Sequence, residues 1–336
     1  MSSKYDFSII GAGSFGTSFA ISLSRQGKRV LLFGRSKDDI DSLSANRENT
    51  KYLPNISFPN SLDVTSDLKY AISCSYTLLI FVPTLSFRTV LNDIKPLLSE
   101  KHKICWATKG LDPVSGNLLK DTAEEILGSK IPLAFLSGPN FAREIAEGLP
   151  TVSTVVSDNE DFLHDLQTKI NCSQSLRVYT NHDFTGVQLG SVVKNVIAIA
   201  AGISDGMGFG ANARVALITR GLAEMVRLAE KLGAHEKTIY GMSGLGDLVL
   251  TCTDNKSRNR RFGLCIGQGQ SLDDAKKNTG KVVEGFVNAK QLRNLAQKVN
   301  VEMPIVEQVY NILYNKQNVK EAIEILMSRS LKSENL

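Results

Sequence analysis

The first half of the chain alternates short apolar runs with longer stretches whose apolar residues recur at helical spacing. This alternation is typical of β-α-β units that build a parallel sheet. Most of the runs are apolar throughout, as expected for strands that helices cover on both faces. The predicted strands are residues 5–10, 29–33, 77–82, 103–107, 133–136, 151–156 and 176–179.

The pattern changes after about Phe184, where strand-like runs end and long helical patterns follow. One helix is predicted from Asn212, a good N-cap, to just before Gly233. Residues 202–210 hold too many glycines for a helix and predict a tight connection, which either passes another group closely or is purely structural. We therefore expect a first domain at residues 1–183, a helical domain at residues 184–330 and a frayed tail at residues 331–336.

Composition supports a folded protein with two domains. The chain has 336 residues, of which 42% are hydrophobic and 22% charged, and it is longer than one hydrophobic core usually serves. Its formal net charge of +5 is too small over this length to indicate nucleic-acid binding. The densest basic segment, residues 256–261, has no broad basic face or stacking aromatic residues around it, so we expect no nucleic-acid partner.

The cysteines and the chain start favour a cytoplasmic protein. Five scattered cysteines form no C-x-x-C pair and have no histidine at metal-ligand spacing, which predicts reduced thiols and no metal site. The polar start runs directly into a predicted strand, so no signal peptide is expected. The most apolar long stretch, residues 187–203, carries Lys194 and Asn195 at its centre, which argues against membrane insertion.

A glycine motif follows the first predicted strand and opens a helix. Gly11, Gly13 and Gly16 have the G-x-G-x-x-G spacing, with Ser14 and Phe15 between them. In this context the glycines provide a tight turn, a close approach to a pyrophosphate and close helix-sheet packing, respectively. A dinucleotide site is the main interpretation. A structural glycine turn or another nucleotide, such as S-adenosylmethionine, is the alternative.

The end of the second predicted strand bears on which dinucleotide binds. A carboxylate there would accept from the ribose 2′-hydroxyl and repel a 2′-phosphate. This chain has Arg35 and Lys37 instead, so NADP is permitted and NADPH is expected to be preferred over NADH. Alternatively, Arg35 only stacks on adenine or lies in solvent.

Two lysines are candidates for chemistry. Lys194 lies among apolar residues, where desolvation lowers the pKa of an amine and suits it to proton transfer near neutral pH. The alternative is a lysine that extends from a domain edge to solvent. Gly186 and Gly190 precede Lys194 at a spacing that lets another backbone approach closely. Lys109 lies just beyond a predicted strand, at the edge where doubly wound sheets bind ligands.

Three further segments carry polar groups in compact turns. Gly138 and Asn140 lie in a turn that follows a strand, and residues 243–248 form a turn that presents Asp247. Ser257, Arg258 and Asn259 place a hydroxyl, a guanidinium and an amide at a predicted helix start, which is typical of a small-anion site. With two lysines and a dinucleotide, this predicts hydride transfer on a small phosphorylated carbonyl compound.

The longer motifs carry a family resemblance. They are GAGSFGT, KGL, LSGPNFA, GVQLGSVVKNVIAIAAGISDGMGFGANARVALITRGLAEM, MSGLGDLVLTCTDNKSRNRRFG and VVEG. The chain resembles the bacterial NAD(P)-dependent glycerol-3-phosphate dehydrogenases essentially from end to end. The resemblance implies an α/β fold, with an N-terminal Rossmann-like doubly wound sheet and an all-helical C-terminal domain like that of 6-phosphogluconate dehydrogenase. It also implies reduction of dihydroxyacetone phosphate to sn-glycerol 3-phosphate, a precursor of phospholipids, by a homodimer.

The resemblance also implies roles for individual residues. Lys194 matches the catalytic lysine that exchanges a proton with the oxygen at C2, and Lys109 matches a residue that contacts substrate and nicotinamide. The implied substrate contacts are Lys109, Gly138, Asn140, Lys194, Asp247, Ser257, Arg258 and Asn259. The implied cofactor contacts are Ser14, Phe15, Arg35, Tyr52, Lys109, Ala142, Arg258, Val282 and Glu284. Asn140 is a departure, because relatives usually have Ser or Thr there.

Two other functions are compatible with parts of this pattern. One is a dehydrogenase of the same architecture that acts on a hydroxy acid or ketopantoate, although the SRNRR segment favours phosphate over carboxylate. The other is a nucleotide-binding regulator without catalysis. Retention of both Lys194 and Lys109 argues against the regulator.

Overall fold

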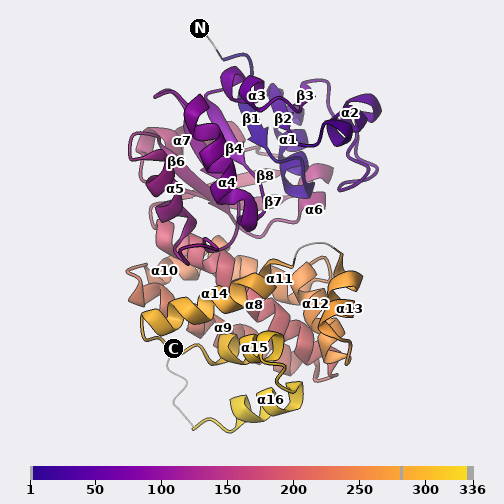
Figure 1. Ribbon diagram of the computed structural model, residues 1–336, viewed down its shortest axis with the longest axis vertical. Coiled ribbons are helices and arrows are strands. Elements are labelled where there is room, and N and C mark those ends of the chain that lie inside the picture. Colours follow the sequence, from indigo (N-terminus) through magenta and orange to yellow (C-terminus); the bar gives the residue numbers. More distant parts are fainter. Residues whose placement is uncertain (1–2, 281–282, 331–336) are drawn as a thin grey trace. The chain divides into compact units, whose positions relative to one another are not determined.

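The computed structural model describes residues 3–280 and 283–330 and divides into two compact units (Figure 1). The first unit is Met1–Thr108 with Leu118–Phe184, and the second is Lys109–Asn117 with Thr185–Leu336. The tail predicted at residues 331–336 lies outside the described residues.

The segment Lys109–Asn117 departs from the predicted boundary, since it belongs to the second unit and the predicted first domain, residues 1–183, includes it. In the second unit, Gln291 Nε2 donates a hydrogen bond of 2.8 Å to the carbonyl oxygen of Leu111. Lys109 itself forms an ion pair within this unit. These contacts attach the segment to helices of the second unit that lie more than a hundred residues later in the sequence.

An eight-stranded sheet forms the centre of the first unit as far as the structure describes it, in the order β3-β2-β1-β4-β5-β6-β7-β8. Its first six strands have the order expected of a doubly wound dinucleotide-binding fold. The strands are β1 (Phe7–Ile10), β2 (Val30–Phe33), β3 (Leu62–Thr65), β4 (Thr77–Ile80), β5 (Lys103–Trp106), β6 (Leu133–Ser137), β7 (Thr151–Ser157) and β8 (Leu176–Asn181). The predicted fold class is confirmed.

Each predicted strand is present, but two features of the sheet were not predicted. Strand β3 was missed because Leu-Asp-Val-Thr contains only two apolar residues, and it lies at the sheet edge, where less burial is needed. The expectation of a parallel sheet is wrong for one pair, because β7 runs antiparallel to β6, with Phe135 opposite Val156. The other neighbouring strands are parallel.

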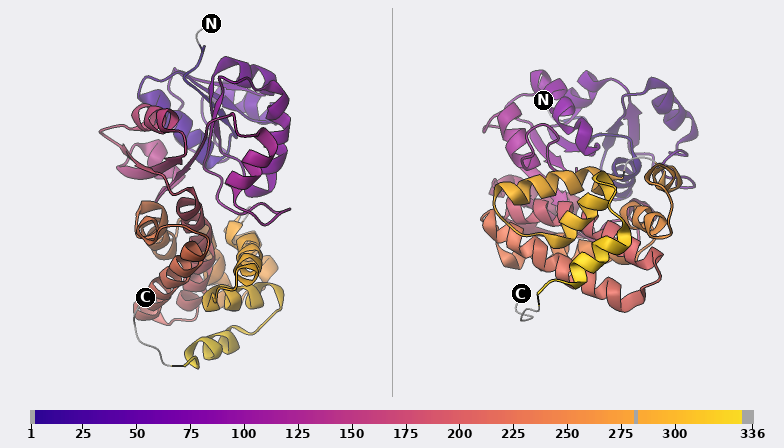
Figure 2. Two further views of the ribbon diagram at one scale, coloured as in Figure 1. Left: turned by 90° about the vertical axis from the view of Figure 1, so that its left-hand side faces the viewer. Right: turned by 60° about the horizontal axis from the view of Figure 1, so that its bottom comes forward.

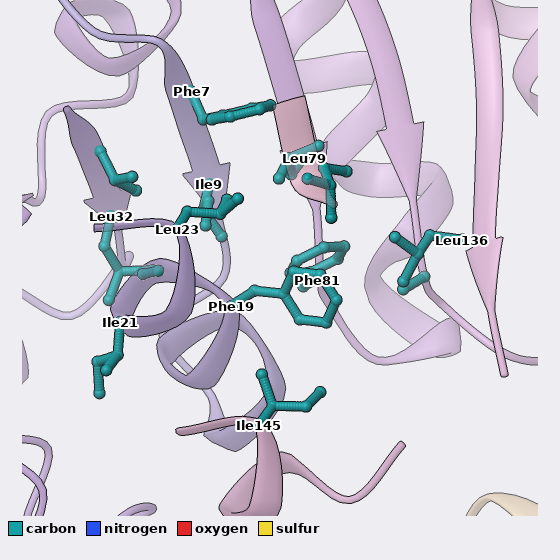
Figure 3. Packing of buried hydrophobic residues seen from close by; sticks show 14 of the residues in the cluster. Phe7, Ile9, Phe19, Ile21, Leu23, Leu32, Leu79, Phe81, Leu136 and Ile145 are labelled. Carbon is teal, nitrogen blue, oxygen red and sulfur yellow. The ribbon is translucent and has the colours of Figure 1, made fainter. Parts of the chain in front are cut away.

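Helices cover both faces of this sheet (Figure 2). On one face, Phe19 of α1 packs with Phe81, and Ile145 of α6 lies beside them (Figure 3). Burial of these large side chains stabilises the packing of α1 on the sheet. The helices of this unit are α1 (Ser14–Arg25), α2 (Lys37–Asn46), α3 (Leu68–Cys74), α4 (Thr84–Ile94), η1 (Lys95–Leu97), α5 (Leu119–Leu127), α6 (Ala142–Glu147) and α7 (Glu160–Ile170).

Besides the irregular segment Lys109–Asn117, the described part of the second unit consists of helices and their connections, beginning with α8. By length and composition α8 could cross a membrane, but 94% of its most apolar window is buried inside the protein. Such burial is typical of a core helix. The helices are α8 (Phe184–Gly206), α9 (Gly210–Lys231), α10 (Glu236–Ile239), η2 (Met242–Gly246), α11 (Asp247–Thr253), α12 (Arg258–Gly267), α13 (Leu272–Thr279), α14 (Glu284–Lys298), α15 (Pro304–Tyr314) and α16 (Val319–Met327).

The connection predicted at residues 202–210 is shorter than expected, because α8 continues through Gly206 and only residues 207–209 join it to α9, which begins at Gly210. The close approach predicted there is confirmed. The glycines are needed for helix packing. A Cβ at Gly202 would lie 2.8 Å from the backbone nitrogen of Leu264 in α12, and one at Gly206 would lie 2.9 Å from the Cα of Gly267. The backbones of α8 and α12 therefore pack closer together than side chains would permit.

This packing predicts that Gly202→Ala destabilises the protein. The new methyl group would overlap the backbone of α12, so we expect the free energy of unfolding to fall by about 2 kcal/mol or more. Denaturant unfolding of the purified variant measures this change. Gly246→Ala is the control, because a Cβ there lies 3.5 Å from the nearest atom, Met242 Sδ, and should change stability by at most about 1 kcal/mol.

Candidate active site

The glycine loop between β1 and α1 has the geometry of an anion cradle. Gly11 has a φ of +123°, and a Cβ there would lie 2.9 Å from the carbonyl carbon of Phe81. A Cβ at Gly16 would lie 3.1 Å from the carbonyl carbon of Gly11, so this glycine lets α1 pack against the loop. Around Gly13, by contrast, no described atom lies within 4 Å of a Cβ position. A pyrophosphate can therefore approach the backbone at Gly13.

The start of α1 and its surroundings fit the same ligand. In the described first turn of α1 there is no acidic side chain, and Gly13 provides no side-chain cap, so the backbone N–H groups face the loop. Asn49 Nδ2 supports the loop by donating to the carbonyl oxygen of Ala12 at 3.1 Å and to Thr17 Oγ1 at 2.8 Å. Asn49 was not singled out from the sequence.

Arg35 follows β2, as predicted, and its side chain is exposed. Among the described residues it has no hydrogen bond or ion pair, so its guanidinium remains available for an anionic group. Lys37, by contrast, pairs with Asp41 at 2.7 Å along α2. Ser36 caps α2, and its hydroxyl accepts from the backbone N–H of Asp39 at 3.2 Å. Arg35 is thus the better placed of the two predicted cations.

The other predicted residues of the first unit lie in or beside three loops. Tyr52 donates its backbone N–H to Asn49 Oδ1 at 3.2 Å and so adjoins the support of the glycine loop. Gly138 has a φ of +132° in the turn after β6, and Asn140 Oδ1 accepts from Ser153 Oγ at 3.3 Å. The Nδ2 of Asn140 is buried without a hydrogen-bond partner in the described part of the chain. Two more cofactor candidates begin helices, with Ala142 the first residue of α6 and Phe15 in the first turn of α1.

The second unit brings together three of the predicted catalytic and substrate residues. Asp247, the first residue of α11, lies between two ammonium groups, with Lys194 Nζ 2.6 Å from Oδ1 and Lys109 Nζ 2.8 Å from Oδ2. The side chains of Lys194 and Asp247 are only 8% and 2% exposed, and that of Lys109 is 15% exposed. Residues far apart in sequence therefore form one buried cluster of charges.

Burial and the neighbouring charges set the protonation of this cluster. Burial lowers the pKa of Lys194 to about 8, and the ammonium of Lys109 adds to this shift while the Asp247 carboxylate opposes it. Burial alone would raise the pKa of Asp247, but the charges of Lys109 and Lys194 hold it below its ordinary value. Asp247 thus remains a carboxylate while Lys194 can gain or lose a proton near neutral pH.

Thr251 is a member of this cluster that sequence reasoning missed. Its Oγ1 donates to the carbonyl oxygen of Asp247 at 2.6 Å and accepts from Lys194 Nζ at 3.1 Å. Thr251 follows Asp247 by four residues, one turn of α11, so recognition of this helix would have indicated it. The sequence pattern predicts only a compact turn at residues 243–248.

A glycine in α8 determines how closely Asp247 can approach Lys194. A Cβ at Gly190, one turn before Lys194, would lie 2.6 Å from the carbonyl oxygen of Ser243 and 3.0 Å from the Cα of Gly244. Both belong to η2, a π-helical turn that leads directly into α11. The close approach predicted at Gly190 is confirmed, and π-turns are common at functional sites.

The predicted anion trio serves two different purposes. Ser257 is the N-cap of α12, where its Oγ accepts from the backbone N–H of Arg260 at 3.2 Å. Asn259 is buried; its Nδ2 donates to Asn195 Oδ1 at 2.8 Å, and its Oδ1 accepts from the backbone N–H of Gly285 at 3.0 Å. Arg258, in contrast, is exposed. Of the three side chains, that of Arg258 is therefore the most accessible to a ligand.

Glu284 begins α14 and belongs to the same electrostatic neighbourhood. Burial raises the pKa of its carboxyl, and the positive charges of Arg258, Lys109 and Lys194 oppose that rise. This residue therefore lies within range of the charged cluster. Val282, predicted as a cofactor contact, lies outside the described residues.

Comparison with known proteins gives consistent matches along the whole chain. Residues 6–163 match a family model described as the N-terminus of NAD-dependent glycerol-3-phosphate dehydrogenase, and residues 183–324 match its C-terminus. A glycerol-3-phosphate dehydrogenase (NAD(P)+) of Vibrio vulnificus is 57% identical over 331 residues, covering 98% of this chain and 96% of the relative. The corresponding protein of Photobacterium profundum is 55% identical, covering 97% and 96%.

Solved structures agree with these matches. The crystal structure of glycerol-3-phosphate dehydrogenase from Coxiella burnetii has a TM-score of 0.93 at 44% identity and covers 97% of this chain and 99% of its own. A D-mandelate dehydrogenase structure has a TM-score of 0.64 at 14% identity, covering 93% and 98%, and shares only the fold.

The charge cluster predicts a pH-dependent loss of stability in Asp247→Asn. Without the carboxylate two ammonium groups remain in a buried site, so we expect a loss of about 3 kcal/mol at about pH 6. The folded-state pKa of Lys194, already lowered from 10.5 to about 8, should fall further in the variant. Above about pH 8, Lys194 is neutral in both the folded wild type and the folded variant. The part of the stability difference that comes from its charge should therefore disappear as the pH rises.

Denaturant unfolding at about pH 6 and about pH 9 measures this difference. Asp165→Asn is the matched control, because Asp165 of α7 also lies between two lysines, Lys169 at 2.9 Å and Lys103 at 4.0 Å, but is only partly buried. It should cost about 0.5 kcal/mol or less at both values of pH. An equal loss for Asp247→Asn at both would contradict the charge-based explanation.

Proposed function

The chain belongs to the family of NAD-dependent glycerol-3-phosphate dehydrogenases, and from this premise we propose that it reduces dihydroxyacetone phosphate to sn-glycerol 3-phosphate. The reaction is reversible and supplies the glycerol backbone of phospholipids. The observation that carries the proposal is the buried cluster in which Asp247 binds the ammonium groups of both Lys194 and Lys109. Such a cluster can supply a proton and positive charge to a carbonyl oxygen.

Lys194 is the proton donor in the reductive direction. The nicotinamide cofactor, when bound, supplies a hydride to C2, and the carbonyl oxygen takes a proton from Lys194 Nζ to become a hydroxyl group. A pKa of about 8 keeps this ammonium protonated at neutral pH while making it a better acid than an ordinary lysine. In the oxidative direction the neutral amine accepts the same proton.

The neighbours of Lys194 hold and assist it. The Asp247 carboxylate fixes the Nζ at 2.6 Å, and Thr251 Oγ1 accepts a second hydrogen bond from it at 3.1 Å. Lys109, on the other oxygen of Asp247, polarises the carbonyl of the substrate. Because these donors are already oriented, little reorganisation is needed as negative charge develops on the oxygen.

We assign the phosphate of the substrate to the first turn of α12. Arg258 offers a guanidinium that can bind two phosphate oxygens, and the start of the helix adds backbone N–H groups and a positive dipole end. Ser257 and Asn259, whose side chains are engaged in the fold, contribute shape and their remaining donors. By resemblance to the family, Gly138 and Asn140 are also proposed as substrate contacts; Asn140 Nδ2 has no hydrogen-bond partner among the described residues.

We assign the dinucleotide to the glycine loop. The open backbone at Gly13 and the uncapped start of α1 support binding of its pyrophosphate there. The exposed guanidinium of Arg35 favours the 2′-phosphate, so we propose NADPH as the preferred cofactor, with NADH also used. The further cofactor contacts proposed are Gly11, Ser14, Phe15, Gly16, Tyr52, Lys109, Ala142, Arg258, Val282 and Glu284.

We also propose that the enzyme is a homodimer in the cytoplasm. Resemblance to the family supports the dimer. The five cysteines support a reducing compartment, because each of them is free in the described structure. No nucleic acid or membrane is proposed as a partner.

An absorbance assay of cofactor oxidation tests the function and the cofactor preference together. Purified protein with dihydroxyacetone phosphate should oxidise both cofactors, with a higher kcat/KM for NADPH than for NADH. Arg35→Ala should reduce this preference roughly tenfold or more, because it removes the cation that pairs with the 2′-phosphate, while activity with NADH stays nearly unchanged. Absence of oxidation, despite NADPH binding, would favour a carboxylate substrate or a regulator.

Lys194→Ala tests the proton donor. Loss of a general acid should lower kcat by roughly 10²- to 10⁴-fold, while NADPH affinity changes little. In the wild type the reductive kcat should fall as the pH rises through about 8, because the neutral amine has no proton to donate, and the oxidative kcat should rise over the same range. Steady-state assays in both directions across this range measure the two profiles. Normal turnover in the variant would remove Lys194 from the mechanism.

A further inference from the structure

Asp205, near the end of α8, forms a second buried charge cluster that the proposed mechanism does not use. Its Oδ1 lies 2.8 Å from Arg214 Nη1 of α9, and its Oδ2 lies 2.5 Å from Arg260 Nη2 of α12. The side chains of Asp205 and Arg260 are both more than nine-tenths buried, whereas that of Arg214 is partly exposed. Charged side chains are rarely buried to this degree unless they are paired.

Arg260 connects this cluster to the proposed phosphate site. Besides its ion pair with Asp205, its Nη1 donates to Asn255 Oδ1, and its backbone N–H donates to Ser257 Oγ. Arg258 lies between these anchored residues in the same turn of α12. The guanidinium of Arg260 therefore joins Asp205 of α8 to Asn255, which precedes Arg258 in the chain. The backbone of Arg260, which follows Arg258, is held by Ser257.

We propose that Asp205 is a positioning residue, which holds Arg260 and thereby fixes the first turn of α12 so that Arg258 binds the phosphate of the substrate. The proposal rests on the function proposed above. Asp205 does not touch substrate or cofactor in this assignment and acts only through Arg260.

Because Asp205 lies in α8, this helix determines the distance between the proposed carbonyl and phosphate sites of the substrate. The same helix carries Lys194 about three turns earlier, so one rigid element holds both the proton donor and the clamp on the phosphate turn. The close backbone packing of α8 and α12 at Gly202 and Gly263 limits movement between them. The spacing between the carbonyl and phosphate sites is thus set by α8, and loosening of the clamp should weaken phosphate binding before it affects proton transfer.

Asp205→Asn tests the inference, because it removes the charge and keeps the shape. We expect the KM for dihydroxyacetone phosphate and the inhibition constant of inorganic phosphate to rise together, by roughly tenfold or more. We expect kcat to change by less than about threefold. The Kd of NADPH, from its fluorescence, should rise by no more than about twofold, because Arg258 is only one of several proposed cofactor contacts. A general structural defect would not produce a selective effect on phosphate.

Arg214→Gln is the matched control, since it removes the other ion pair of Asp205 and leaves the pair with Arg260. Its KM should remain within about twofold of the wild type. Arg260→Lys keeps the charge but loses the forked geometry, and should raise KM to an intermediate extent; it replaces Asp205→Asn if that variant does not fold.

The outcomes separate this inference from the proposed function. A wild type that oxidises NADPH with dihydroxyacetone phosphate, together with an unchanged KM in Asp205→Asn or Arg260→Lys, would overturn the positioning role alone. An equal rise of KM in Arg214→Gln would also overturn it, because the effect would not then pass through Arg260. A wild type without dehydrogenase activity would overturn the proposed function instead.

Discussion

The proposed active site depends on one carboxylate that is shared by two buried ammonium groups. With Lys109, Lys194 and Asp247 all ionised, the cluster retains one unbalanced positive charge in a place that water hardly reaches. Such a charge is costly in the isolated protein and becomes favourable when an anion or a developing alkoxide lies beside it. The same burial that disfavours the ammonium of Lys194 makes it a stronger acid. In the proposed mechanism, stability and catalysis are therefore linked at Asp247.

Close backbone packing brings these charges together. Gly190 lets η2 approach α8, and the next residue after η2 is Asp247, which then reaches Lys194. The glycines at 202 and 263 do the same for α8 and α12. Side chains at these positions would separate the helices and lengthen ion pairs that depend on short distances. The apolar, glycine-containing character of α8 thus serves the charges at its centre.

Most of the fold could be predicted from the sequence, because a strand buried on both faces has a distinctive apolar run. The prediction failed where local pattern and tertiary role differ. Strand β3 is half polar because it lies at an edge, and β7 reverses direction although its sequence resembles that of a parallel strand. Residues 202–206 are unsuitable for a helix by propensity alone, yet packing against α12 stabilises them as one. Each error came from a contact with a distant part of the chain.

The residue types of the candidate site could be predicted from the sequence, but not which of them stabilise the fold and which are available to a ligand. Spacing and resemblance indicated Lys109, Lys194, Asp247 and the Ser257-Arg258-Asn259 segment, and the structure joins the first three directly. A sequence cannot show which donors are already used within the fold. Asn259 links α8 to α14, and Ser257 caps a helix, so their polar groups stabilise the turn that Arg258 extends from. In the proposed anion site, the exposed Arg258 binds the phosphate, and its buried neighbours determine the position of Arg258.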